Sequence, residues 1–229
     1  MARVSAGAAP GVEVAARVDP AAPRPAAAAA GPGYRRGKRA VDVVLSALGL
    51  VLLAPVLVAC AAAVRLSSPG PVLFRQARAG LGGRPFALLK FRSMRHAAGG
   101  PLVTARGDAR VTRVGRLLRR SKLDELPQLW NVLVGDMSLV GPRPEVPYYV
   151  ERFAADYARI LTVRPGITDF AAVEYRDEEA LLAASGDPQS TYEHVVLPAK
   201  ITLYHRYLDE MSLSTDLSLL LRTLTALFP

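Results

Sequence analysis

The uncharged run from Val43 to Val64 constrains this chain more than any other feature, because it is long enough to enter a membrane and carries Pro55 near its middle. A helix over this run would be about 33 Å long at 1.5 Å per residue, close to the thickness of a bilayer's hydrocarbon core. Proline removes a backbone donor and clashes with the preceding turn, so a helix bends or breaks at Pro55. The run therefore predicts a membrane helix that is interrupted at its centre.

Basic residues flank the run on both sides: Arg35, Arg36, Lys38 and Arg39 precede it, and Arg65, Arg75, Arg78 and Arg84 follow it. Because a basic excess marks the cytoplasmic side of a membrane, both ends are expected on that side. We therefore predict a re-entrant helix hairpin over residues 34–66, while a proline-kinked spanning helix stays open on the run alone. A secretory signal or a lipidated Cys60 is disfavoured, because the run begins deep in the chain.

The composition limits the kinds of partner that the chain is expected to bind. The chain has 229 residues, a net charge of +9 and 51% hydrophobic residues, a balance that suits a membrane surface, a nucleic acid or a phosphorylated substrate. Its single cysteine excludes an internal disulfide, and its three histidines have no zinc-site spacing. Residues 1–33, rich in alanine, proline and glycine, are predicted to be a disordered leader, and residues 67–229 one domain.

Two segments that follow the run have readable secondary structure. Residues 67–94 predict a β-hairpin whose extended segments meet at a glycine-rich turn over 80–83. Lys90 and Arg92 end its second segment and could face a phosphate, although solvated strand-end charges are commoner. Residues 106–122 predict a basic amphipathic helix that would lie on anionic lipid headgroups. Nucleic-acid binding is the alternative for that helix, weakened by the lack of aromatic side chains.

The segment "SKLDELPQLWNVLVGDMSLVGPRPE" at 121–145 carries the most specific pattern. Placing Asp124 at a helix N-cap puts Pro127 in the first turn, gives the helix an apolar face that includes Trp130, and ends it at Gly135. Asp124 and Glu125 would then stand at the positive end of the helix, with arginines one turn upstream. Such a potential favours an ionised, nucleophilic aspartate and can hold a polyphosphate, while simple helix capping stays open.

Two further stretches matter for function and packing. Pro142 and Pro144 stiffen the loop around Arg143, which suits bidentate recognition of a phosphate, although an ordinary surface turn fits the same letters. Near the C-terminus, an apolar helical stripe predicts packing on the core, with a membrane interface as the alternative. This stripe consists of Leu217, Leu220, Leu221, Leu224 and Phe228.

Several of these motifs occur together and in order in one known family. "SKLDELPQLWNVLVGDMSLVGPRPE", "SPGPVLFRQARAG", "LLKFRSM", "RPGIT" and the preceding apolar run resemble the bacterial sugar transferases, the monotopic phosphoglycosyl transferases. The resemblance covers about residues 35–228. Two departures stand out: Ala54 replaces the serine that often precedes the proline, and "DFAAVEYRDEEALL" replaces a glycine-tryptophan form.

The resemblance implies a mixed, helix-rich α/β fold: one small cytosol-facing domain, a re-entrant membrane hairpin and amphipathic interfacial helices. It also implies a location on the cytoplasmic face of the bacterial inner membrane. The implied reaction transfers a sugar-1-phosphate from a nucleoside diphosphate sugar, usually UDP-linked, to polyprenol phosphate through a covalent aspartyl intermediate. This would be the first membrane step in the synthesis of an exopolysaccharide, capsule, O-antigen or glycoconjugate.

The same resemblance assigns residue roles. Asp124 matches the nucleophile and a ligand of Mg²⁺, and Glu125 matches its acidic partner. Arg119 and Arg143 match arginines that hold phosphate, and we add Lys90 to this group. No nucleic-acid partner is expected, and a homo-oligomer stays open. The alternative is a membrane-anchored basic scaffold that binds polyanions through residues 106–122, but it leaves the Asp124–Glu125 pair without a role.

Overall fold

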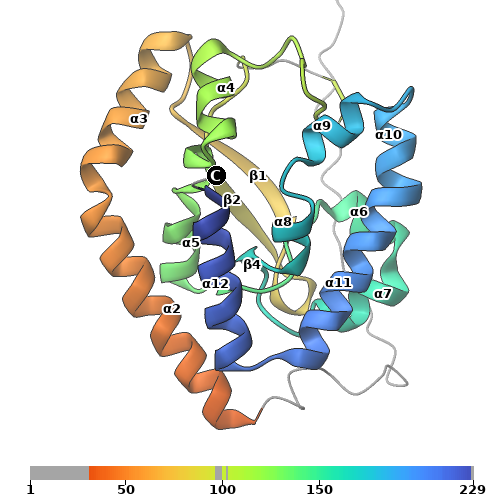
Figure 1. Ribbon diagram of the computed structural model, residues 1–229. Helices are drawn as coiled ribbons and strands as arrows, with labels where there is room; N and C mark the ends of the chain where they lie inside the picture. Colours follow the sequence, from red (N-terminus) through yellow and green to blue (C-terminus); the bar gives the residue numbers. More distant parts are fainter. Residues whose placement is uncertain (1–30, 96–99, 102, 228–229) are drawn as a thin grey trace, which may run out of the picture.

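The computed structural model describes residues 31–95, 100–101 and 103–227, so the predicted leader over 1–33 lies almost wholly outside the described residues. These residues form a helix-rich mixed α/β fold, as predicted (Figure 1). The elements in chain order are α2 Pro32–Leu52, α3 Ala54–Ser67, β1 Leu73–Ala79, η1 Leu81–Gly83, β2 Pro85–Phe91, α4 Arg113–Arg120, η2 Leu123–Glu125, α5 Gln128–Val134, β3 Ser138–Val140, α6 Pro147–Arg152, α7 Ala154–Ile160, β4 Gly166–Thr168, α8 Phe170–Glu174, α9 Glu178–Ala183, α10 Pro188–Thr191, η3 Tyr192–Val196, α11 Leu197–Glu210 and α12 Leu213–Leu227.

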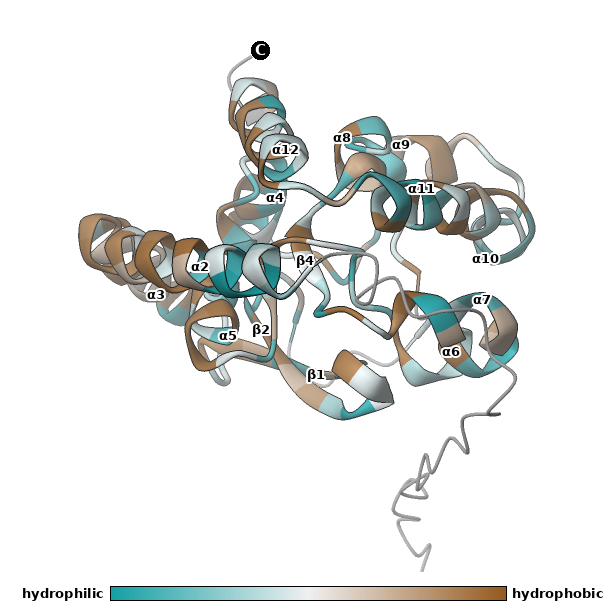
Figure 2. Ribbon diagram, turned by 90° about the horizontal axis from the view of Figure 1, so that it is seen from below, coloured by the Kyte–Doolittle hydropathy of each residue, from teal (hydrophilic) through white to brown (hydrophobic). Residues whose placement is uncertain are grey.

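The apolar run folds as two helices that meet at Leu53. Pro55 lies in the first turn of α3, where its missing donor leaves no helical hydrogen bond unmade. In the described part of the chain, no single helix combines the length and the apolar character needed to cross a membrane. By length and composition alone, α2 and α3 meet that requirement only as a pair, bent by 63°. In Figure 2 the first turns of α2 are teal and white, and brown, hydrophobic residues dominate the part of the pair near α3.

Polar contacts tie the first half of α2 to the rest of the fold. Arg39 donates to the carbonyls of Val132 and Leu133, at 2.7 and 2.9 Å, and so caps the end of α5. The Asp42 carboxylate accepts the backbone N–H of Leu139 at 3.0 Å. The basic flank that precedes the apolar run is therefore also a docking surface for α2.

The far end of α3 is held as firmly. The Arg92 side chain is buried, and its guanidinium donates to the carbonyls of Val64 and Ser68, at 3.3 and 2.7 Å. Arg92 therefore caps α3 and does not face a phosphate or the solvent, which corrects both sequence readings of this residue. Cys60 and Val64 pack with Phe91 in a small core beneath α3.

The predicted hairpin is confirmed: β1 and β2 pair antiparallel on either side of η1. A second, parallel pair joins β3 to β4. At its end the two backbones touch, since a Cβ on Gly166 would lie 2.1 Å from the amide nitrogen of Gly141. Only glycine permits this approach, which brings the loop carrying Arg143 beside the chain that leads into α8.

The main core lies between the β3–β4 pair and α11, and it contains four almost fully buried tyrosines: Tyr149, Tyr157, Tyr204 and Tyr207. The prediction that the C-terminal stripe packs on this core holds in part, for Leu220. On α12 the core residue is Leu219, whereas Leu217, Leu221 and Leu224 are each more than half exposed. Phe228 lies outside the described residues.

Two predicted helices differ in extent or orientation. The basic helix begins at Arg113 instead of 106, because Thr112 caps it and the residue before, Val111, forms a β-bridge with Met94. The predicted apolar face of α5 is not its buried face: Gln128, Asn131 and Val132 are buried, while Trp130 is 52% exposed. Gly135 ends α5 in a left-handed conformation, as predicted.

Candidate active site

The two predicted acidic residues sit on their own short turn, η2. Lys122 has φ 58° and is the one non-glycine residue with positive φ in the described part of the chain. This left-handed residue ends the α4 segment and starts the 3₁₀ turn that carries Asp124 and Glu125. Asp124 is therefore not the N-cap of α5, a place that Pro127 takes, and the expected helix-dipole arrangement is wrong. Backbone strain of this kind recurs at functional sites.

Glu125 is the centre of an ion cluster. Lys90, near the end of β2, donates to Glu125 Oε1 at 2.8 Å. Both terminal nitrogens of Arg143 donate to the same carboxylate, one to each oxygen. Although burial opposes ionisation, these two cations hold the pKa of Glu125 well below its usual range. Arg143 thus makes a bidentate contact, as predicted, but its partner here is the Glu125 carboxylate and not a phosphate.

Arg143 is held by its backbone as well as by its side chain. Its N–H donates to Asp169 Oδ2 at 3.0 Å, and the guanidinium reaches the carbonyl of Ile167 at 3.3 Å. The other oxygen of Asp169 caps α8 by accepting the N–H of Ala172 at 2.6 Å. Asp169 therefore locks the Arg143 loop to the start of α8.

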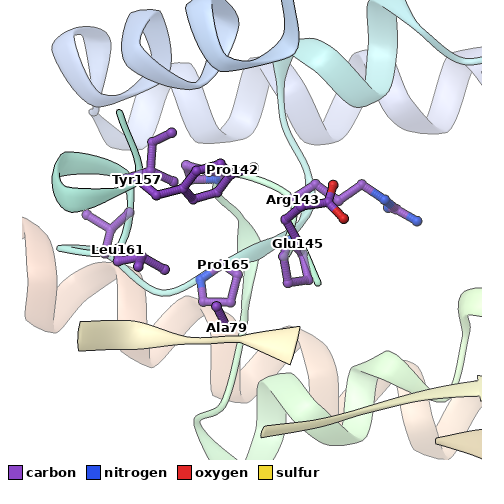
Figure 3. Close-up of a pocket in the computed structure, with 10 residues that line it drawn as sticks. Ala79, Pro142, Arg143, Glu145, Tyr157, Leu161 and Pro165 are labelled. Atoms are coloured by element: carbon purple, nitrogen blue, oxygen red, sulfur yellow. The ribbon is translucent and has the colours of Figure 1, made fainter. Parts of the chain in front are cut away.

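A small cavity lies behind the Arg143 loop. Figure 3 shows the Arg143 side chain extending away from Tyr157 and Leu161, which line this cavity. About 10 Å³ of it is open to the centre of a water molecule, enough for about one water. This cavity is too small for a sugar nucleotide. The Arg143 guanidinium points away from it, toward Glu125, and we place the candidate site on that side.

Asp124 differs from Glu125 in its hydrogen bonding and in the direction of its pKa shift. It is 5% exposed, and its Oδ1 has no hydrogen-bond partner among the described residues. Burial raises the pKa of Asp124, and the nearby Lys90 only partly opposes this. Burial thus outweighs the nearby cations in setting the pKa of Asp124. Its carboxylate is more basic than usual, and neither of its oxygens has a described hydrogen-bond donor.

Arg119 stands apart from the ion cluster. Its Nε donates to Ser93 Oγ at 2.8 Å, and its Nη1 donates to Glu179 Oε1 on α9 at 2.5 Å. Gly115 makes this placement possible, because α4 lies so close to β2's end that a Cβ there would be 1.9 Å from the carbonyl oxygen of Ser93. The structure thus groups Lys90, Asp124, Glu125 and Arg143, with Arg119 engaged elsewhere.

Sequence reasoning missed three residues of this region: Ser93, Asp169 and Glu179. Asp169 had a usable signal, since an aspartate before "FAAVE" is a typical helix N-cap. Its bond to the Arg143 loop had no signal, because the two residues are 26 positions apart. The partners of Arg119 also come from separate segments that only the fold brings together.

The arrangement suits chemistry on a phosphate. Lys90 and Arg143 neutralise one carboxylate and leave a buried, basic carboxylate beside fixed positive charge. Phosphoryl transfer depends mainly on such positioning and charge compensation. No group of three or more His, Cys, Asp or Glu side chains suited to a metal occurs in the described ranges. A carboxylate such as that of Asp124 is a suitable ligand for a hard cation bound with a phosphate.

Comparison with known proteins identifies the family. The family model described as bacterial sugar transferase matches residues 33–229. The chain belongs to the bacterial sugar transferase family. This confirms the resemblance drawn from the motifs around Asp124 and Arg143.

Three similar proteins are named as transferases that act with undecaprenyl phosphate. A Caulobacter vibrioides protein, UDP-glucose:undecaprenyl-phosphate glucose-1-phosphate transferase, is 45% identical over 83% of this chain and 69% of its own length. An Escherichia coli protein of the same name is 50% identical over 59% of this chain, but only 30% of its own length is matched. A Bacillus subtilis protein, putative undecaprenyl-phosphate N-acetylgalactosaminyl 1-phosphate transferase, is 45% identical over 52% of this chain and 68% of its own.

Proposed function

We propose that this protein transfers a sugar-1-phosphate from a UDP-sugar to a membrane polyprenol phosphate, by way of a covalent intermediate on Asp124. The observation that carries the proposal is the buried Asp124 carboxylate, which has no described hydrogen-bond donor, beside a neighbouring Glu125 that two cations neutralise. The names of its relatives supply the substrate class, a UDP-sugar and undecaprenyl phosphate. This reaction would begin the membrane assembly of a polysaccharide or glycoconjugate.

The two steps follow from the chemistry of the carboxylate. Asp124 attacks the sugar-bearing phosphorus, a bond forms between its oxygen and that phosphorus, and the bond to the departing uridine monophosphate breaks. A polyprenol phosphate oxygen then attacks the same phosphorus and releases Asp124. Lys90 and Arg143 would balance the charge of the phosphates in both steps. Mg²⁺, for which the Asp124 carboxylate is a suitable ligand, would neutralise diphosphate charge.

The proposed membrane element is a re-entrant hairpin formed by α2 and α3. Its support is that both ends of the pair contact the same domain, through Arg39 on one side and Arg92 on the other. Two ends held by one compact domain lie on one side of a bilayer, which we take to be the cytoplasmic side. The exposed leucines of α12, together with Leu117 on α4, would rest in the interface.

The scaffold alternative accounts for less of the molecule. Binding through residues 106–122 has the exposed basic side chains it needs, among them Arg113, Arg116 and Arg120. It gives no role to Lys90 and Arg143, which pair with the buried carboxylate of Glu125. It also gives no role to the left-handed Lys122 turn or to the buried, unpaired carboxylate of Asp124. Membership in the sugar transferase family favours the enzyme over the scaffold.

The test of the proposal is isotope exchange without an acceptor. A covalent intermediate predicts that labelled UMP enters UDP-sugar in the absence of polyprenol phosphate, and that Asp124→Asn abolishes this exchange. The control is Asp209→Asn, the same chemical change at an exposed position of α11. Because burial of the Asp124 charge costs stability, Asp124→Asn should keep or raise the melting temperature. Exchange by the Asp124→Asn protein would reject this nucleophile.

A further inference from the structure

A second pocket lies under the first turns of α2, away from the candidate active site. It is bounded by α2, β3, the segment before β4 and the end of α11, and about 70 Å³ is open to the centre of a water molecule. None of Lys90, Arg119, Asp124, Glu125 and Arg143 lines it. Among the lining residues, four are basic and one is acidic: Arg35, Lys38, Arg39 and Arg164 against Asp42.

Several of the basic side chains have N–H groups without a described hydrogen-bond partner. Arg164 uses only its Nε, on the carbonyl of Gly135 at 2.8 Å, so its terminal nitrogens have no partner among the described residues. Arg35 makes no described side-chain bond. Lys38 has one partner, Asp216, at 2.9 Å. The lining acid is already committed, because Asp42 accepts the N–H of Leu139. The pocket therefore presents cationic donors without a described protein partner, which suit a phosphate group.

The surroundings of the pocket indicate where such a phosphate would come from. The exposed apolar side chains of α2 begin at Val41, beside the pocket-lining Asp42, and continue with Val44 and Leu45. α12 starts beside the same turns, since a Cβ on Gly37 would lie 3.9 Å from Leu213. Leu213 and Leu217 are also exposed there. A charged site bordered by apolar surface matches a molecule that has an anionic head and hydrocarbon tails.

We propose that this pocket binds the phosphate of an anionic glycerophospholipid headgroup, with Arg35 and Arg164 as its main donors. The proposal rests on the membrane location proposed above, since the pocket then lies where α2 enters the headgroup layer. The bound lipid would hold the start of α2 to the segment before β4 and fix the depth of the α2–α3 pair. It would act as a structural lipid and not as a substrate.

The sequence offers a matched pair of variants to test the site. Arg35→Gln and Arg36→Gln remove the same charge from adjacent, exposed positions of α2, but only Arg35 lines the pocket. The full chain would be purified in neutral detergent, which removes the surface potential of the bilayer. It would then be titrated with phosphatidylglycerol, and native mass spectrometry would give the number of lipid molecules retained per protein.

We expect the wild type and Arg36→Gln to retain one phosphatidylglycerol, and Arg35→Gln to need about fivefold more lipid for equal occupancy. Arg164→Lys, which keeps the charge and loses the fork, should also weaken retention. Equal effects of the two α2 variants would overturn the site, because they would show general charge attraction. Displacement of the lipid by millimolar inorganic phosphate would instead identify a soluble-anion site. UMP release by the same preparations, measured separately, reports on the proposed catalytic function.

Discussion

Asp124 and Glu125 are adjacent in the sequence, yet their surroundings move their acidities in opposite directions. Glu125 is ionised against Lys90 and Arg143, so its pKa is low. Asp124 is buried without a partner for one oxygen, so its pKa is raised. A pair of carboxyl groups with separated pKa values is a common sign that each has its own role. In the proposed mechanism Glu125 would hold the cations in place, and Asp124 would supply the nucleophilic oxygen.

The raised pKa of Asp124 predicts the acid side of the pH profile. The reactive form is the carboxylate, so single-turnover UMP release should fall as the pH drops through the raised pKa. That midpoint should lie above the value of about 3.9 of an ordinary aspartate. Glu125 does not titrate in this window because its pKa is lowered. Rates measured from pH 4 to 8 that stay flat would contradict this account of Asp124.

The contact between Arg119 and Glu179 predicts a competition with substrate. If Arg119 holds a phosphate during the reaction, that phosphate must displace the Glu179 carboxylate. Exposed or half-exposed pairs of this kind contribute up to about 1 kcal/mol, so Glu179→Gln should lower the KM for UDP-sugar by up to about fivefold. Initial-rate kinetics over a range of UDP-sugar concentrations would measure this change.

Glu178→Gln is the matched control for that experiment. Glu178 is the preceding residue of α9, but it pairs with Lys200 at 2.8 Å and has no described bond to Arg119. Its substitution should leave the KM unchanged. A rise in KM for Glu179→Gln would mean that Glu179 positions Arg119 for the substrate and does not compete with it.

At the scale of elements, the packing of α4 on the end of β2 predicts a stability effect. A methyl group at Gly115 would meet the carbonyl oxygen of Ser93 at 1.9 Å, so α4 must shift in Gly115→Ala. Overpacking of this kind typically costs about 1–3 kcal/mol, and the shift would also break the Arg119–Ser93 bond. Denaturant unfolding should show this loss, together with a fall in turnover.

Gly186→Ala provides the comparison for Gly115→Ala. A Cβ at Gly186 would have no atom within 4 Å, and its backbone is not in the left-handed region. Its unfolding free energy should therefore stay close to that of the wild type. A Gly115→Ala protein as stable as Gly186→Ala would show that α4 can move away from Ser93 without cost.

Local sequence signals predicted some elements and failed for others, for physical reasons. The hairpin and the break near Pro55 were predictable because turn glycines and proline act on their own neighbours. The faces of α5 and α12 were not, because a helical pattern identifies an apolar stripe without saying what covers it. Trp130 and Leu221 belong to such stripes and are exposed. At the site, the local motif identified Asp124 and Glu125. Asp169 and Glu179 were missed because they come from distant segments of the chain.

At the scale of the whole molecule, the two ends of the α2–α3 pair are fixed to one domain. Arg39 caps α5 near the start of the pair, and Arg92 caps α3 at its end. The site lies between these anchors in the chain's fold, since Lys90 is two residues from Arg92 and α5 follows Glu125. Insertion of the pair into a bilayer would therefore bring the carboxylates close to the membrane surface, where a polyprenol phosphate headgroup is found.

This arrangement predicts the topology of the apolar run. In a Cys60→Ser background, a cysteine placed at Arg36 or at Pro71 lies on either side of the α2–α3 pair at an exposed position. Because both ends contact the same domain, a thiol reagent that cannot cross membranes should label neither site in intact cells and both sites in inverted vesicles. A spanning helix would place one site on each side. Labelling of only one of the two cysteines in inverted vesicles would therefore reject the re-entrant hairpin, whatever the catalytic assays show.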